Sequence, residues 1–262
     1  MTNSTRLEHA KGLYLEGIRD GNMKAALDRH VGDRYIQHST GVADGKEGFM
    51  EFFGPFLERT PIRDIQVVRA FEDGRYVFCH VYQNLNNGAA KWVTADLFDT
   101  DESGRLIEHW DVIAEYVWPT ASGRSMVDGP TEIEDLDKTD ANKAVVQGFV
   151  DDVLIGGRAD KVTDYISTEQ YDQHNPEVED GLAGFGKHLQ AVMASGAATE
   201  YVKVHHLIGQ GNFVVVYSHT RMQGDDYAFF DIFRLKDSKI VEHWDVQEKT
   251  GPEDTWNNSG KF

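Results

Sequence analysis

The chain has 262 residues, a hydrophobic content of 40% and a formal net charge of −18. This negative charge repels phosphate backbones and anionic lipid surfaces, so we expect no nucleic acid and no membrane among its partners. No apolar stretch approaches the roughly 20 residues of a membrane span, and the first residues lack the apolar core of a signal peptide. The composition therefore predicts a soluble, cytoplasmic protein.

The first half of the chain predicts helices followed by strands. A capping box at Thr5-Arg6-Leu7-Glu8 precedes apolar residues at helical spacing. A short helix follows Gly21-Asn22, a brief strand covers residues 35–38, and a third helix begins at Asp44-Gly45. Runs of alternating apolar and polar residues, separated by Gly, Asn and Asp, then predict four strands. These strands cover residues 65–71, 76–82, 92–98 and 106–114.

The second half repeats this plan. Helices are predicted at residues 145–153 and 161–166 and from Leu182 onward, followed by strands at 201–208, 213–222, 227–235 and 240–246. Residues 121–138 are polar and acidic, which is typical of a linker. Helices followed by a strand meander predict an α+β class, with helices packed on a curved, mostly antiparallel sheet. We expect one such domain at residues 1–120 and another at 139–262.

Short motifs recur in the two halves, in the same order and at nearly the same spacing. Repeats of this kind indicate two homologous domains. The matched motifs are Tyr35-Ile36-Gln37-His38 with Tyr171-Asp172-Gln173-His174, Asp96-Leu97-Phe98 with Asp231-Ile232-Phe233, and Glu108-His109-Trp110-Asp111 with Glu242-His243-Trp244-Asp245.

Together these motifs resemble the SnoaL-like branch of the NTF2-like superfamily, which includes polyketide cyclases and proteins described as aldol-condensation enzymes. The resemblance covers both halves, and the ending Asn257–Phe262 also looks like that of this group. It implies a cone-shaped α+β barrel in each half, with an apolar cavity at its open mouth. It further implies that Asp111 and Asp245 act as general acid/base groups. Asp96 and Asp231 correspond to a position near the second catalytic group, which is a histidine in the characterised cyclases.

Alternation along a strand places His109 beside Asp111, and His243 beside Asp245, on one face. Removal of a proton next to a carbonyl needs a base and a donor for the enolate. We therefore predict that both pairs are catalytic together with Asp96 and Asp231. Substrate contacts are predicted for three residues in each half. These are Tyr35, Gln37 and His38 in the first half and Tyr171, Gln173 and His174 in the second.

Several alternatives stay open at this point. A buried His-Asp pair is as often a structural hydrogen bond as a catalytic one, and Trp110 and Trp244, on the other strand face, are expected to be packing residues. A two-histidine, one-carboxylate metal site matches the residue types but lacks close ligand spacing, so no metal and no cofactor are expected.

We therefore predict an enzyme of the cyclase, aldol-type lyase or isomerase class that acts on a small apolar or aromatic molecule. The alternative is a binding module for such a molecule without catalysis. The two domains are expected to pack as an intramolecular pseudo-dimer, and the sequence leaves a homodimer open.

Overall fold

The computed structural model describes residues 4–195 and 199–262 and divides into two compact units. Unit 1 combines Met1–Glu115 with the C-terminal tail Gly251–Phe262, and unit 2 is Tyr116–Thr250. The predicted boundaries were therefore wrong in two places. The tail packs with the first unit, and residues 121–138 form part of unit 2 instead of a free linker. None of the described helices is both long and apolar enough to cross a membrane.

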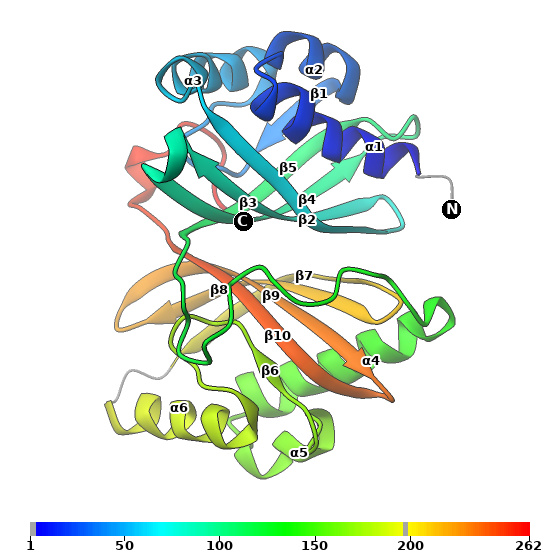
Figure 1. The fold of residues 1–262 in the computed structure, drawn as a ribbon, viewed down its shortest axis with the longest axis vertical. Helices are drawn as coiled ribbons and strands as arrows, with labels where there is room; N and C mark the ends of the chain where they lie inside the picture. The colour runs from blue at the N-terminus through cyan, green and yellow to red at the C-terminus, as the bar shows by residue number, and fades with distance from the viewer. Residues whose placement is uncertain (1–3, 196–198) are drawn as a thin grey trace. The chain divides into compact units, whose positions relative to one another are not determined.

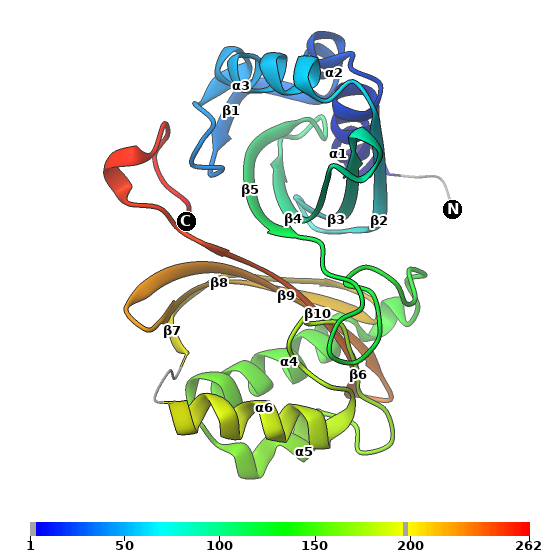
Figure 2. The same ribbon diagram turned by 60° about the vertical axis from the view of Figure 1, so that its left-hand side comes forward.

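Unit 1 is an α+β fold in which helices lie on the inner side of a curved five-stranded sheet (Figures 1 and 2). The strand order is β1-β5-β4-β3-β2, and only β1 runs parallel to its neighbour. Its elements are α1 (Thr5–Gly12), the π-helix η1 (Leu13–Arg19), α2 (Met23–His30), β1 (Val31–Gln37), α3 (Gly45–Arg59), β2 (Arg63–Asp73), β3 (Tyr76–Leu85), η2 (Asn86–Gly88), β4 (Ala90–Thr100) and β5 (Leu106–Glu115).

Unit 2 has the corresponding strand order, β6-β10-β9-β8-β7, and again only the short first strand is parallel to its neighbour. Its elements are η3 (Leu136–Lys138), α4 (Thr139–Phe149), the π-helix η4 (Val150–Ile155), η5 (Ala159–Lys161), α5 (Val162–Tyr165), β6 (Asp172–Gln173), α6 (Gly181–Ser195), β7 (Glu200–Gln210), β8 (Phe213–Met222), β9 (Asp225–Lys236) and β10 (Lys239–Lys249). A short 3-10 helix, η6 (Glu253–Thr255), lies in the tail.

The predicted α+β class is confirmed, and all eight predicted long strands are present. The third helix also begins where Asp44-Gly45 predicted it, with Asp44 as the N-cap. The first N-cap was misplaced by one residue. Ser4 has the extended backbone of a cap, and its hydroxyl accepts a hydrogen bond from the Leu7 N–H at 3.3 Å. Thr5 is already helical, so it cannot fill that position.

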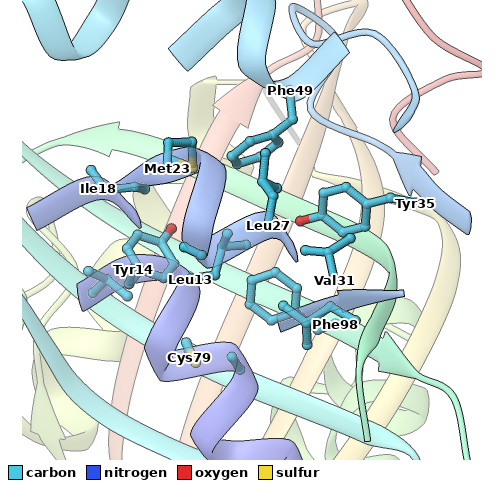
Figure 3. Packing of buried hydrophobic residues seen from close by; sticks show 14 of the residues in the cluster. Leu13, Tyr14, Ile18, Met23, Leu27, Val31, Tyr35, Phe49, Cys79 and Phe98 are labelled. Carbon is cyan, nitrogen blue, oxygen red and sulfur yellow. The ribbon is translucent and has the colours of Figure 1, made fainter. Parts of the chain in front are cut away.

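The helices of each unit bury their apolar faces against the sheet. In unit 1, Leu13 and Leu27 pack with Phe49 and Phe98 (Figure 3), and each large side chain removed from water contributes about 1.5–3 kcal/mol. In unit 2, Phe149 lies at the corresponding point of the core. The packing is incomplete, because a cavity remains between the helices and the last two strands of each unit.

Candidate active site

Strand register brings the predicted polar residues of unit 1 together. Asp96 on β4 lies opposite Asp111 on β5, and Phe98 lies opposite His109. The parallel strand β1 places Gln37 beside His109. Paired positions share one face of a sheet, so these side chains meet on the face that lines the cavity.

The ring of His109 is held at both nitrogens. Nε2 lies 2.9 Å from Oδ1 of Asp96, and Nδ1 lies 3.1 Å from Oε1 of Gln37. The ring stacks on Phe98 at a centroid distance of 4.5 Å. Asp96 is held as firmly, since Tyr14 donates to Oδ1 at 2.7 Å and Thr94 donates to Oδ2 at 2.8 Å. His109 therefore has no ring nitrogen left for a substrate.

Asp111 is paired with a cation from the C-terminal tail. Nζ of Lys261 lies 3.2 Å from Oδ1 of Asp111, and Lys261 is only 1% exposed. Burial by itself would raise the pKa of Asp111, but the charges of Lys261 and His109 and a hydrogen bond from Ser39 outweigh burial. The pKa of Asp111 therefore lies below the usual aspartate value, and its carboxylate is ionised at neutral pH.

Unit 2 repeats the same register with different partners. Asp245 on β10 lies opposite Asp231 on β9, and His243 lies beside Gln173 of β6. His243 Nε2 is 3.0 Å from Oδ1 of Asp231, and Nδ1 is 3.0 Å from Oε1 of Gln173. The partner of Asp245 is neutral, because Asn175 donates its amide N–H to Oδ2 at 2.5 Å.

The pKa of the last-strand aspartate shifts in the opposite direction from that in unit 1. Burial raises the pKa of Asp245 to about 6, and the charge of Asp231 adds to this effect, while His243 and Asn175 oppose it. Burial lowers the pKa of His243, but the hydrogen bond to Asp231 and the nearby Asp245 charge more than offset burial, so this pKa is raised. The raised pKa of His243 favours its protonated form, and the neighbouring Asp245 carboxyl, with a pKa of about 6, can exchange a proton near neutral pH.

In each unit, the cluster of polar side chains described above lines a cavity with mostly apolar walls. The unit 1 cavity has a volume of about 390 Å³ and the unit 2 cavity about 690 Å³. Of the predicted site residues, Gln37, Asp96, His109 and Asp111 line the first, and Tyr171, Gln173, Asp231, His243 and Asp245 line the second.

Two predicted substrate contacts, His38 and His174, are wrong. Their neighbours Gln37 and Gln173 point into the cavities, and successive side chains of a strand point to opposite faces. His38 accordingly stacks on Trp110 at 4.8 Å, and His174 stacks on Trp244 at 4.6 Å. The predicted substrate contact of Tyr35 is also wrong. Its ring is buried against His109 and does not form part of the cavity wall.

His38 and His174 anchor the segments that follow the last strands. Nδ1 of His38 donates to the carbonyl of Gly260 at 2.5 Å, and Nδ1 of His174 donates to the carbonyl of Ser125 at 2.6 Å. The anchored tail thereby places Lys261 beside Asp111. We refer to residues 122–129, which make the corresponding contacts in unit 2, as the unit 2 strap.

Sequence reasoning missed Lys261, Asn175 and the pair Tyr14 and Thr94. The signal for Asn175 was the difference between His174-Asn175-Pro176 and His38-Ser39-Thr40, because this position faces the aspartate of the last strand in both units. Lys261 lies far from Asp111 in the chain, and no local pattern predicts that a distant tail supplies the counter-charge.

Three residues of unit 2 have the atoms to hold a cation. One ligand atom from each of Asp231, His243 and Asp245 lies within 4.8 Å of the others, and carboxylate and imidazole groups suit several divalent metals. Binding would require His243 to break a hydrogen bond, since both ring nitrogens are already engaged. In unit 1, the Lys261 ammonium beside Asp111 opposes a second cation.

A comparison with known families finds a match within the second unit. Residues 146–243 match the model of the SnoaL-like domain. Unit 2 contains a SnoaL-like domain. The matched residues of this SnoaL-like domain include Asp231 and His243. None of the curated proteins compared with the chain matches it.

Solved structures similar to part of the chain include a candidate ketosteroid isomerase from Kribbella flavida, with 13% identity and a TM-score of 0.38, covering 44% of this chain and 83% of that one. IdmH from Streptomyces antibioticus, described as a candidate polyketide cyclase, has 16% identity and a TM-score of 0.36 over 42% of this chain and 92% of its own. An LEH-like epoxide hydrolase of M. tuberculosis has 15% identity and a TM-score of 0.36 over 42% of this chain and 85% of its own.

Proposed function

We propose that the protein is a small-molecule enzyme of the cyclase, aldol-type lyase or isomerase class, built from two copies of the SnoaL-like fold. The observation that carries this proposal is Asp245, a buried carboxyl with a pKa of about 6 that lines a largely apolar cavity. General acid/base catalysis works best when the pKa of the group lies near the working pH. Buried carboxyls with shifted pKa values in cavities mark functional sites.

In this mechanism, Asp245 removes a proton from the carbon next to a substrate carbonyl and returns it at a second position. His243 is not the base, because both of its nitrogens are occupied. Its positive charge, fixed by Asp231 and Gln173, lies beside the reacting group and offsets the negative charge of the enolate. A fixed charge in a water-poor cavity stabilises such a charge more than water does.

The second candidate function is binding without catalysis, and it is favoured for unit 1. There Asp111 already has a cation as its partner, which makes it a weak base. The cavity walls include Phe53, Phe56 and Trp92, which suit an apolar or aromatic molecule.

The proposed function is tested by proton exchange at carbon. The protein is incubated in D₂O with a panel of aromatic 1,3-diketones and cyclic enones, and deuterium incorporation is followed by NMR. We expect Asp245→Asn to slow incorporation about 100-fold or more, as is typical when a general base is removed. Asp225→Asn, which changes an exposed carboxyl paired with Lys249, is the control and keeps the rate. Equal rates in Asp245→Asn and the unchanged protein would exclude Asp245 as the base.

A further inference from the structure

The ionisable groups of the unit 1 site are satisfied by the chain itself. Asp96 accepts hydrogen bonds from Tyr14 and Thr94 in addition to its contact with His109. Asp111 has Lys261 and Ser39 as partners. Each buried charge is thus compensated, as buried charges require, and neither carboxylate needs a ligand to complete its hydrogen bonds.

The two residues that donate hydrogen bonds to Asp96 are replaced by apolar residues in unit 2. Gly12-Leu13-Tyr14 in the first π-helical region corresponds to Gly148-Phe149-Val150 in the second, so Val150 replaces the Tyr14 hydroxyl. Thr94 precedes Asp96 by two residues on β4, and Phe229 precedes Asp231 in the same way on β9. Neither replacement can donate a hydrogen bond.

The residue that corresponds to Lys261 in unit 2 is also uncharged. Lys261 directly follows Gly260, whose carbonyl is bound by His38. In the unit 2 strap the corresponding carbonyl belongs to Ser125, and the residue after it is Met126. Met126 is as deeply buried as Lys261 but carries no charge. Asp245 is left with the neutral amide of Asn175 as its side-chain partner in this position.

One acceptor of unit 2 is consequently unsatisfied. Asp231 is 5% exposed and lines the cavity, and its Oδ2 has no hydrogen-bond partner among the described residues, while Oδ1 is bound to His243. Leaving a buried acceptor without a hydrogen bond destabilises the unliganded site, and a charged acceptor does so more strongly than a neutral one. A ligand that donates a hydrogen bond to this oxygen regains that free energy on binding.

We propose that the unit 2 cavity is the reacting site of the protein and takes ligands that carry a hydroxyl group on an apolar or aromatic body. The hydroxyl donates to Oδ2 of Asp231, and this bond holds the reacting carbon near Asp245. The carboxylates of the unit 1 cavity already have partners, so this cavity does not select ligands with a hydroxyl donor and performs no proton transfer. This inference rests on the proposed function for the choice of Asp245 as the reacting group, but its binding step can be measured independently.

The test compares two probes with the same ring system. 2-Naphthol can donate a hydrogen bond, whereas 2-methoxynaphthalene can only accept one. Their dissociation constants are measured by NMR titration of the full-length protein, with amide shifts of β9 and β10 reporting on unit 2 and those of β4 and β5 on unit 1. We expect 2-naphthol to bind unit 2 about 10-fold or more tightly than its methyl ether, as one hydrogen bond to a charged group predicts, and unit 1 to show no such preference.

Two variants remove the acceptor in different ways. Asp231→Asn keeps an oxygen for His243 but can place an N–H where Oδ2 was. Phe229→Thr introduces the hydroxyl that Thr94 supplies in unit 1, where it donates to Oδ2 of Asp96 at 2.8 Å. Each variant should bring the ratio of the two dissociation constants in unit 2 close to one. Phe229→Thr leaves both members of the Asp231–His243 pair in place, so it serves if Asp231→Asn fails to fold.

Asp245→Asn separates this inference from the proposed function. It should retain the preference for 2-naphthol although it loses proton exchange. Loss of exchange in Asp245→Asn, with equal binding of the two probes to the unchanged protein, would overturn the ligand assignment and leave the proposed function standing. A preference that disappears with EDTA and returns with Zn²⁺ would also overturn it, because Asp231, His243 and Asp245 would then be ligands of a metal.

Discussion

At the scale of single residues, Lys261 and Met126 illustrate how one side chain sets the properties of a neighbouring acid. Both follow a carbonyl held by a histidine, at Gly260 and Ser125 respectively, and both are buried. Lys261 supplies a charge to Asp111 and lowers its pKa, whereas burial dominates for Asp245, whose pKa rises to about 6. The same strand motif therefore carries two acids of different strength.

Lys261→Met should raise the pKa of Asp111, since it removes the cation that opposes burial. A carboxyl with a lowered folded-state pKa stabilises the fold above its unfolded pKa, and this stabilisation is lost as pH falls through the folded pKa. The variant should therefore lose about 3 kcal/mol of unfolding free energy at pH 7 and less near pH 4. ¹³C NMR titration of Asp111 and urea unfolding at the two pH values would measure these effects. An unchanged Asp111 titration would contradict the role given to Lys261.

Asp245→Asn should change stability in the opposite direction. The folded-state pKa of about 6 lies above the unfolded value of about 3.9, so the contribution of Asp245 is fully favourable below pH 3.9 and is lost as pH rises through 6. An amide resembles the protonated acid and does not ionise. We expect the variant to be more stable than the unchanged protein by about 1–3 kcal/mol at pH 8, with little difference at pH 4.5. Urea unfolding at both pH values tests this, and a variant that is less stable at pH 8 would contradict the raised pKa.

Residue roles were only partly predictable from sequence. Alternation correctly grouped His109 with Asp111, and the strand register places Asp96, which was singled out through the family resemblance, opposite Asp111. The same alternation should have excluded His38, because Gln37 beside it faces the cavity. The pKa difference between Asp111 and Asp245 was not predictable, since it depends on contacts between segments that are distant in sequence.

At the scale of elements, the strands and the start of α3 follow from local patterns, because alternation and Asp-Gly act within a few residues. The tail Gly251–Phe262 has no such pattern. Its further contacts with unit 1 include those of the Asn258 amide, which donates to the carbonyls of Ser39 at 2.6 Å and Val42 at 2.9 Å. The tail thus secures the loop that carries Ser39, a partner of Asp111.

Deletion of residues 259–262 should destabilise unit 1 and leave unit 2 unaffected. It removes the carbonyl acceptor of His38 and the cation beside Asp111, and breaking a buried ion pair costs about 3–5 kcal/mol. Hydrogen exchange should therefore accelerate in β1 and β5, while β6 and β10 keep their protection. Replacement of the exposed Thr255 by Ala is a control within the same tail. Equal acceleration in both sheets would show that the deletion acts without the contacts described for unit 1.

At the scale of the whole molecule, the chain enters unit 2 at Tyr116 and returns to unit 1 at Gly251. Each unit is therefore completed by the segment that follows the last strand of the other. In unit 2 the strap residue Arg124 reaches Asp172 at 2.6 Å, and the indole N–H of Trp244 donates to the carbonyl of Asp128 at 2.9 Å. Repeated motifs predicted two domains, but they could not show that the connecting segments are exchanged.

Because the connecting segments are exchanged, a fragment cut at the domain boundary predicted from the sequence should be less stable than the corresponding unit in the full chain. A fragment of residues 1–120 lacks the tail, so Asp111 loses Lys261 and His38 loses its carbonyl acceptor. We expect its melting temperature to be lower than that of unit 1 in the full chain. A synthetic peptide of residues 251–262 should raise this temperature in a concentration-dependent way, because a ligand that binds the folded state alone stabilises it by mass action.

The same peptide with Lys261→Ala is the matched control and should stabilise the fragment less at pH 7. At a pH low enough to protonate Asp111, the two peptides should become more alike, because the ion pair then contributes nothing. Calorimetric melting of the fragment with each peptide measures both differences. If the fragment melted at the temperature of unit 1 and neither peptide bound it, the tail would not be an integral part of the first unit.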